Sequence, residues 1–275
     1  MSKYEQILEK ARKSFPGEEF SLNSITNSKK TYMGLCIGAA ENGCFVIDLD
    51  EAVQEEALME EIKALLKRRK KVSGLKSEAE KAKDYSWVKE KLRLRLAKNP
   101  PATIFQKDAA FGGGIKMFLH IALRGDANMI VNHELVEAWG VSEEELFADA
   151  IKATAAAEGA VVKPLNQHMA DLSGRDVEDI PDNGLWFSSN KASYYGASVL
   201  VYPGFLEEFY KKNGAFFVLP SSVHEVLLLV KGDVVTDALG EMVRNINSNA
   251  VDKHEVLSNN VFVYESPEKG LVVVN

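Results

Sequence analysis

The sequence contains little cysteine, and a chain of this length does not need disulfides to fold. A chain of 275 residues can bury a core large enough to fold without disulfides or a structural metal. Its two cysteines, Cys36 and Cys44, flank Asn42-Gly43, a pair typical of a two-residue hairpin turn. That register places Cys36 opposite Leu49, too far from Cys44 for a disulfide. We therefore expect both thiols to be reduced, as in a cytoplasmic protein.

Long apolar runs are also absent. The longest, such as 226–230, are far shorter than the roughly 20 residues that a transmembrane helix needs. The first five residues are charged and have no apolar segment behind them, so we expect no secretory signal. No internal repeat or low-complexity segment is visible. These features predict a cytoplasmic protein without a membrane partner.

The composition is that of a folded domain, and its charge is unevenly spread. The chain is 46% hydrophobic and 27% charged, which excludes a disordered chain, a collagen and a coiled-coil rod. Residues 1–100 carry 20 Lys and Arg against 16 Asp and Glu, whereas residues 101–275 carry 13 against 24. The acidic C-terminal portion would repel nucleic acid, and only the stretch 63–98 would attract phosphates.

Hydrophobic periodicity predicts both helices and strands in the N-terminal half. In order, we expect a helix at 4–15, a hairpin at 31–49, a helix at 51–71, a polar link at 72–84, a helix at 87–96, and paired strands at 115–123 and 127–132. Ser142, with Glu145 three residues later, is an N-cap signature for a helix that continues to about residue 157.

The C-terminal half predicts a β-α-β-β-α-β order, which matches the split βαβ motif. We expect strands at 185–189 and 196–202, a helix at 203–214, strands at 215–219 and 224–230, a helix at 237–247, and strands at 261–265 and 271–274. The fold class is α+β, with a largely antiparallel C-terminal sheet. An N-terminal region at 1–160, a connecting segment at 161–184 and a C-terminal region at 185–275 are expected, and the two regions either fold separately or share one core.

Four stretches of the sequence resemble an uncharacterised domain family. They lie at 137–145, 186–190, 195–203 and 219–226, and the last, Leu-Pro-Ser-Ser-Val-His-Glu-Val, is the most specific. The family that the sequence resembles is widespread in anaerobic gut bacteria and their mobile elements. The similarity extends over about residues 30–265. The resemblance implies a cytoplasmic bacterial or phage origin and no mechanism, although a mobile-element association would favour a regulator or inhibitor of a host system.

The turn at 221–225 is the best single site candidate. Ser221, Ser222, His224 and Glu225 could supply a nucleophile, a base and an orienting carboxylate. Catalytic triads are defined by geometry, however, and are seldom drawn from near neighbours in sequence. The alternative is a polar turn whose serines cap backbone groups and whose histidine is hydrogen-bonded at a sheet edge.

A second candidate begins like a zinc-protease motif. His133-Glu134 is followed by Glu137 where that motif has its second histidine. His133 and Glu137, one helical turn apart, could share a divalent ion only if ligands came from elsewhere. The alternative is a surface helix with Trp139 packed inward. We assign no metal site and no cofactor.

The basic run of the chain is a third candidate. Its members are Lys67, Arg68, Arg69, Lys70 and Lys71. Glutamates at 55–61 lie about one turn or more before the run, as in a solvated helix with ion pairs along its surface. A basic end also suits the negative C-terminus of a helix. We therefore favour a solvated helix end over a nucleic-acid interface.

Three remaining features are expected to be structural. His120 lies in an apolar strand and is expected to be a core or half-buried histidine with its hydrogen bonds satisfied. His254-Glu255 is assigned to the surface. The glycine-rich segment 111–116 lacks the spacing of a phosphate-binding loop and is expected to be a flexible entry into a strand.

The sequence contains no complete catalytic or cofactor motif in a chain well patterned for folding. It therefore predicts a non-catalytic cytoplasmic protein that binds or regulates another macromolecule, with an unidentified protein partner and an undetermined oligomeric state. The first alternative is a hydrolase that uses the 221–225 turn or the His133 pair. The second, weaker alternative is nucleic-acid binding through 63–98.

Overall fold

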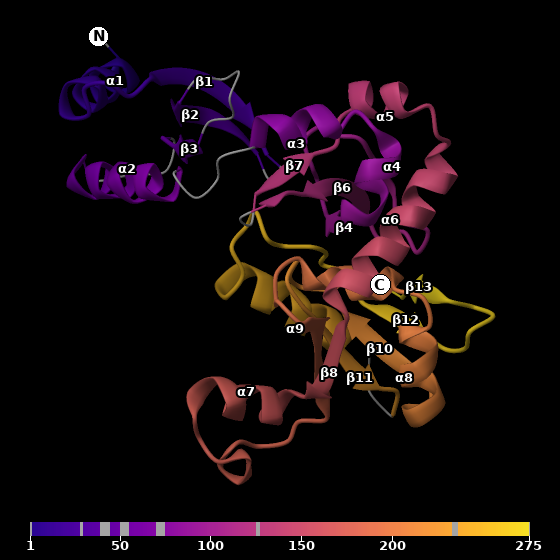
Figure 1. Cartoon of the computed structure of the whole chain (residues 1–275). Coiled ribbons are helices and arrows are strands. Elements are labelled where there is room, and N and C mark those ends of the chain that lie inside the picture. The colour runs from indigo at the N-terminus through magenta and orange to yellow at the C-terminus, as the bar shows by residue number, and fades with distance from the viewer. Residues whose placement is uncertain are drawn as a thin grey trace.

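The computed structural model describes residues 2–27, 30–38, 45–49, 55–69, 75–124, 127–232 and 236–274. Within these ranges the strands form three antiparallel sheets that follow one another along the chain (Figure 1). Helices and antiparallel strands both contribute, so the predicted α+β class is confirmed. No helix of the described part combines the length and apolar character needed to span a bilayer.

The first sheet belongs to an N-terminal unit, residues 2–69. Its elements are α1 (Lys3–Ser14), β1 (Phe20–Thr26), β2 (Thr31–Ile37), β3 (Phe45–Asp48) and α2 (Glu55–Arg69). Ser2 begins α1, because its side chain accepts the N–H of Glu5 while the Glu5 carboxylate accepts the N–H of Ser2. Ala11 of α1 and Ile62 of α2 are buried in one apolar cluster with Leu35 of β2.

The predicted hairpin exists, but its expected register was wrong. Cys36 pairs with Val46 instead of Leu49, and Ile37 pairs with Phe45. This register buries Leu35 and Ile47 on the same face of the sheet, where the two helices cover them. The expected Asn42-Gly43 turn and Cys44 lie outside the described residues, and Cys36 is a buried free thiol.

The segment after α2 folds differently from the prediction. Part of the expected polar link forms a helix, α3 (Leu75–Lys81). The expected helix at 87–96 is wrong: α4 (Tyr85–Val88) and the single turn η2 (Lys89–Lys91) lead into a strand, β4 (Leu92–Ala97). The residues of β4 alternate Leu and Arg with a period of two, which suits a strand with the leucines on one face and the arginines on the other.

The middle sheet has β6 (Lys116–Ala122) between β4 and β5 (Gln106–Asp108), with β7 (Asn128–Ile130) also paired to β6. The predicted strands at 115–123 and 127–132 are thereby confirmed. Two helices follow, α5 (His133–Trp139) and α6 (Glu143–Glu158). Ser142 caps α6 as predicted, since its Oγ accepts the N–H of Glu145 at 3.1 Å.

The third sheet and its helices occupy the rest of the chain. Its elements are β8 (Ala160–Pro164), α7 (Leu165–Ser173), η4 (Val177–Asp179), β9 (Leu185–Asn190), η5 (Gly196–Val201), α8 (Phe205–Asn213), β10 (Phe216–Leu219), β11 (Val226–Val230), α9 (Thr236–Asn249), β12 (Phe262–Tyr264) and β13 (Leu271–Val273). Two expectations fail here. The segment expected to connect two regions contains the edge strand β8 and α7, and the strand expected at 196–202 is the buried 3₁₀ segment η5.

The strand order of this sheet is β13-β12-β10-β11-β9-β8, with every neighbouring pair antiparallel. β9 and β10 therefore run in the same direction with β11 between them, and β11 and β12 do so with β10 between them. These are two interleaved split βαβ units. Phe216 faces Phe209 of α8, whereas Phe217 is buried with Leu239 of α9, so the helices cover opposite faces.

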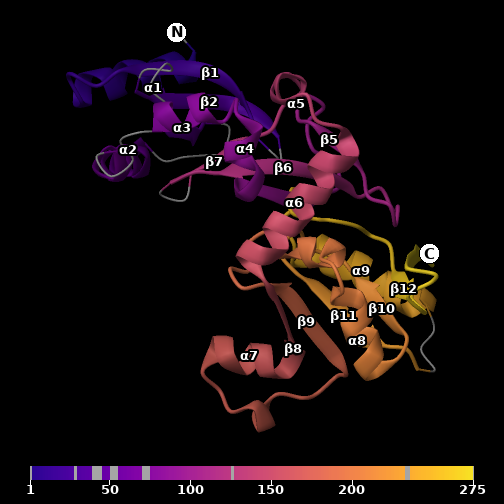
Figure 2. The ribbon, with the colours of Figure 1, turned by 45° about the vertical axis from the view of Figure 1, so that its right-hand side comes forward.

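One cluster of buried apolar side chains extends from the middle sheet into the third sheet, from Ala82 to Leu271. The N-terminal unit has a separate cluster. Figure 2 gives a second view, and in both views the N-terminal unit and α7 lie at opposite ends of the molecule.

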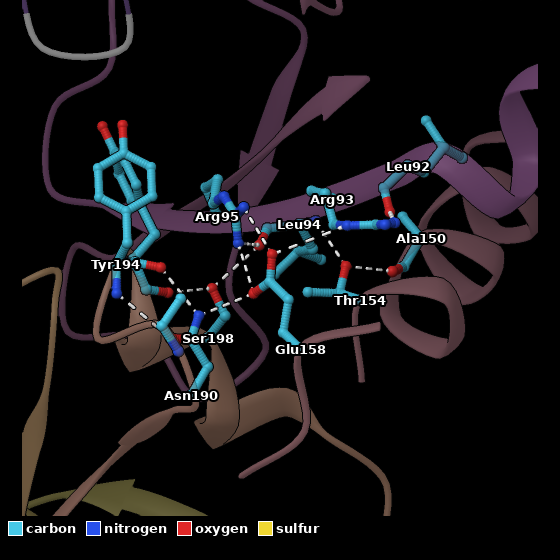
Figure 3. A network of polar contacts seen from close by, with 12 residues as sticks. Leu92, Arg93, Leu94, Arg95, Ala150, Thr154, Glu158, Asn190, Tyr194 and Ser198 are labelled. Atoms are coloured by element: carbon cyan, nitrogen blue, oxygen red, sulfur yellow. Dashed lines mark hydrogen bonds and ion pairs between the residues drawn. The ribbon is translucent and has the colours of Figure 1, made fainter. Parts of the chain in front are cut away.

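A buried polar network joins the middle and third sheets (Figure 3). Arg95 of β4 donates from Nη1 and Nη2 to the two carboxylate oxygens of Glu158, which ends α6, at 2.8 and 2.7 Å. Asn190 of β9 donates to the same carboxylate at 2.8 Å. Ser198 of η5 donates to the carbonyl oxygen of Leu94 at 3.0 Å. This network fixes η5, and the loop before it, against β4.

Candidate functional site

A polar cavity of about 480 Å³ lies where the three sheets meet. The N-terminal unit contributes Asn27, Lys30 and Asp48, and the middle sheet contributes His120, Asn128 and Ile130. The remaining wall comes from the loop between β9 and η5, with Tyr194 and Tyr195, and from the loop between α9 and β12, with Asp252, His254 and Glu255. A cavity of this size is in the range of small-molecule binding sites.

His120 is the most unusual residue of this cavity. It is 6% exposed, and neither imidazole nitrogen has a hydrogen-bond partner within the described part of the chain. The expectation that its hydrogen bonds are satisfied was therefore wrong. Burial, followed by the positive charge of Arg95, lowers the pKa of His120 from 6.5 to about 3. The ring is thus neutral near pH 7, with one nitrogen able to donate and the other able to accept.

The loop that carries Tyr195 is held in a strained conformation. Tyr195 is 2% exposed and has a φ of 52°, in the left-handed region that a bulky residue seldom adopts. Its ring centroid lies 6.1 Å from that of His120. A Cβ on the next residue, Gly196, would collide with Ser189 Oγ and the carbonyl oxygen of His224, so only glycine fits there.

The 221–225 turn lies directly behind this loop. Nδ1 of His224 accepts the N–H of Tyr195 at 3.2 Å, and Nε2 lies 3.3 Å from Oε1 of Glu255. Nδ1 accepts a hydrogen bond and therefore carries no hydrogen. The tautomer with its hydrogen on Nε2 makes both contacts. His224 therefore orients two residues of the cavity wall.

The two serines of this turn contact backbone N–H groups in different ways, Ser222 through its hydroxyl and Ser221 through its main-chain carbonyl. Oγ of Ser222 accepts the N–H of His224 at 3.0 Å, and the carbonyl oxygen of Ser221 accepts the N–H of Leu257 at 3.0 Å. Since both imidazole nitrogens of His224 are engaged elsewhere, neither is placed to take a proton from a serine. Burial raises the pKa of Glu225, while a hydrogen bond from Ser222 opposes this shift. The arrangement is that of the polar-turn interpretation.

The His133 candidate lies on the surface of α5. His133, Glu134 and Glu137 are exposed, and the His133 ring stands edge-on to Phe105 with the centroids 5.3 Å apart. Nowhere in the described ranges do three His, Cys, Asp or Glu side chains gather closely enough to hold a metal ion. The structure thus brings no third ligand to this pair.

Some of the basic residues in the segment 63–98 form internal ion pairs. Arg95 binds Glu158, and Lys89 forms an ion pair of 2.8 Å with Asp149. The last turn of α2 contains Lys67, Arg68 and Arg69, whose side chains are not among the described ones. The next two residues, Lys70 and Lys71, lie outside the described residues. Because their charges are balanced by Glu158 and Asp149, Arg95 and Lys89 contribute little positive charge to a nucleic-acid interface.

Comparison with known protein families supplies one match. A model of a family of unknown function, DUF5688, matches residues 115–266, which is more than half of the chain. The chain belongs to the DUF5688 family. The DUF5688 region contains every cavity residue from His120 to Glu255 and leaves out the three from the N-terminal unit. No curated protein and no solved structure matches the chain.

Proposed function

We propose that this DUF5688 protein is a non-catalytic binding protein, and that its cavity receives a protruding segment of a partner protein. The observation that carries this proposal is His120, in the wall of a polar cavity of about 480 Å³, whose imidazole nitrogens have no hydrogen-bond partner among the described residues. A buried polar group without a partner destabilises a fold by about 1–3 kcal/mol. Such groups are rare in folded proteins, and a binding role would explain this one.

The strained loop supports the same location. Tyr195 keeps a left-handed backbone next to the cavity, and the His224 side chain holds it there. Backbone strain of this kind persists only where the surrounding structure enforces it, and it concentrates at active sites and ligand clamps. The cavity wall therefore combines two features that lower the stability of the fold, the buried imidazole of His120 and the strained backbone of Tyr195.

The position of His224 favours binding over hydrolysis. Its two contacts, with Tyr195 and Glu255, make it a brace between the two loops of the cavity wall. A brace of this kind preorganises a binding site, which reduces the ordering needed when a ligand arrives.

Two features favour a macromolecular partner. The walls come from three sheets, so a partner that reaches into the cavity also meets the surrounding surface of the N-terminal unit. Tyr194 is 49% exposed beside the cavity, and its ring stands against Tyr195 with the centroids 4.9 Å apart. Exposed tyrosines next to a pocket are common anchor residues of protein interfaces.

The cellular setting is part of the proposal. We propose a cytoplasmic location, with which the buried free thiol of Cys36 is compatible. The association with anaerobic gut bacteria and their mobile elements rests on the sequence resemblance alone. A regulator or inhibitor of a host system would need a specific protein partner, and the proposed binding of a partner segment in the cavity would meet this need.

The experiment is a capture from native-host lysate with three forms of the protein: wild type, Tyr194→Ala and Leu172→Ala. Leu172 of α7 is 71% exposed and lies outside the cavity, so its variant is a matched control for loss of an exposed apolar side chain. We expect one stoichiometric partner that is retained by wild type and Leu172→Ala and lost by Tyr194→Ala. A partner lost only with Leu172→Ala, or turnover of a small compound abolished by His224→Ala, would contradict the proposal.

A further inference from the structure

We propose that this protein forms a homodimer through β1, and that two copies of this strand pair antiparallel about a two-fold axis at Ser24. The three-stranded sheets of the two N-terminal units then join into one continuous sheet. This inference goes beyond the proposed function, because it uses neither the cavity nor its ligand. It follows from the hydrogen-bonding direction of β1, from its uncharged sequence and from the protection that the other edge strands have.

The backbone of β1 bonds alternately toward its neighbour β2 and toward an open edge. Gly38 donates its N–H to the carbonyl oxygen of Glu19 at 2.8 Å. At the other end of the strand, Asn27 donates its N–H to the carbonyl oxygen of Lys30 at 3.0 Å. These bonds fix the odd-numbered residues as those that bond to β2. The even-numbered residues therefore point their N–H and C=O groups away from the sheet: Phe20, Leu22, Ser24 and Thr26.

Three of these four residues form a symmetrical set. The carbonyl oxygen of Phe20 already accepts a hydrogen bond from Nη2 of Arg12 at 2.9 Å. The outward backbone groups of Leu22, Ser24 and Thr26 have no hydrogen-bond partner among the described residues. An antiparallel second copy centred on Ser24 pairs each Leu22 with a Thr26 and Ser24 with itself. Each of these three pairs exchanges about two main-chain hydrogen bonds.

The side chains of β1 suit a copy of the same strand. The strand Phe20–Thr26 contains no charged residue and no proline, so pairing with itself brings no like charges together. Opposed serines at the axis can hydrogen-bond to each other. Leu22 is half-buried, and so is Leu8 of α1, one turn before Arg12 on the side of the helix that reaches this edge. A second copy along the edge covers more of this apolar surface.

The other edge strands of the described sheets have the protection that β1 lacks. Lysine and proline occur together in β8, charged residues occur in β3 and β5, and β7 and β13 have three residues each. The edge of β4 is covered, because Thr154 accepts the N–H of Leu94 and Ser198 donates to the Leu94 carbonyl oxygen. Charges, proline and short length keep sheet edges from pairing. β1, with seven residues, has none of these features, as expected of a strand that pairs in the functional assembly.

The test measures the oligomeric state of the full chain by sedimentation velocity, from micromolar to sub-millimolar concentration. We expect a monomer–dimer equilibrium for wild type. Ser24 is exposed, so a charged replacement there leaves the fold of the monomer intact. Ser24→Lys and Ser24→Glu should each weaken dimerisation at least about tenfold, because like charges meet at the axis. An equimolar mixture of the two variants should restore dimerisation, with opposite charges at the axis.

Val272→Lys is the matched control. Val272 is 46% exposed on β13, an edge of another sheet, so the same charge there should leave the dimer unchanged. Hydrogen exchange adds a readout for each residue. The amides of Leu22 and Thr26 should exchange slowly in the wild-type dimer and rapidly in Ser24→Lys. The amide of Asn23, which bonds to β2, should stay protected in both.

A wild-type protein that is monomeric over the whole concentration range would overturn the inference. So would a dimer that Val272→Lys dissociates and Ser24→Lys leaves intact. Protection of the β1 edge only when a monomer binds a captured partner protein would also overturn it, since the occupant would then be a strand of that partner. The capture through Tyr194, which tests the proposed function, depends on none of these results.

Discussion

Arg95 and Glu158 form a bidentate ion pair, in which Nη1 and Nη2 of Arg95 lie 2.8 and 2.7 Å from the two carboxylate oxygens (Figure 3). Arg95 is 4% exposed, so its removal leaves a nearly buried negative charge. We expect Arg95→Met to lower the free energy of unfolding by about 3 kcal/mol or more, measured by urea denaturation. Arg95→Met combined with Glu158→Leu should recover part of this loss, because the buried carboxylate is removed while Arg93 and Asn190 lose their contacts with Glu158. A double variant as unstable as the single one would contradict this interpretation.

Gly196→Ala tests the close approach behind the cavity. A Cβ at this position would strike Ser189 Oγ and the His224 carbonyl oxygen, and would lie 2.7 Å from the backbone nitrogen of Asn190. Two of these neighbours are backbone atoms, so the loop itself must move. We expect a loss of about 2–3 kcal/mol in the free energy of unfolding, and altered NMR signals from Tyr195. Gly232→Ala, at a position with open space around it and no left-handed φ, is the matched control and should change the free energy of unfolding little.

Glu225 provides a prediction about pH. Burial raises the pKa of its carboxyl above 4.5. The unfolded chain therefore loses this proton at a lower pH than the folded protein, and stability is lost as the pH rises through the raised pKa. Glu225→Gln should be more stable than wild type at pH 7, with a difference that vanishes near pH 4. Equal differences at the two pH values, in urea denaturation, would contradict the direction of this shift.

His120 predicts the opposite trend at mildly acidic pH. Its pKa is about 3 in the folded protein against 6.5 for a free imidazole, so the unfolded state takes up the proton first as the pH falls. This group alone should lower the free energy of unfolding by about 2 kcal/mol between pH 7 and pH 5. His120→Leu should be less sensitive to this change of pH by that amount. Identical pH profiles for the variant and wild type would contradict the assignment.

Local patterns predicted the elements whose signal lies in a short stretch of sequence. The cap at Ser142, the helix ended by Gly214 and the antiparallel strands around 215–230 are all present. The segment 87–96 was misassigned because Val88, Leu92 and Leu96 have helical spacing, while the Leu–Arg alternation fits a strand equally well. Pairing with β6, whose residues are 19 to 29 positions further along the chain than their partners in β4, decides between them. The apolar run in η5 was ambiguous for the same reason.

The cavity could not be predicted because its residues are distant in sequence. They extend from Asn27 to Glu255 and meet only after three sheets have packed. The turn at 221–225, which the sequence analysis singled out, lies behind the cavity wall, where His224 contacts Tyr195 and Glu255. The one local signal was His120, a titratable residue inside an apolar strand, and its lack of a partner is visible only in the folded structure.

The most direct test of the central claim, that the cavity around His120 is a binding site, is the free energy of unfolding of His120→Leu at pH 7 with and without one probe, the partner that wild type captures from lysate. Replacement of a buried, unpartnered polar group by an apolar one of similar size should stabilise the unliganded protein by about 1–3 kcal/mol. The probe should then stabilise the variant less than it stabilises wild type, because one wall of the site has changed. A variant that is less stable than wild type, and that gains as much from the probe, would contradict the claim.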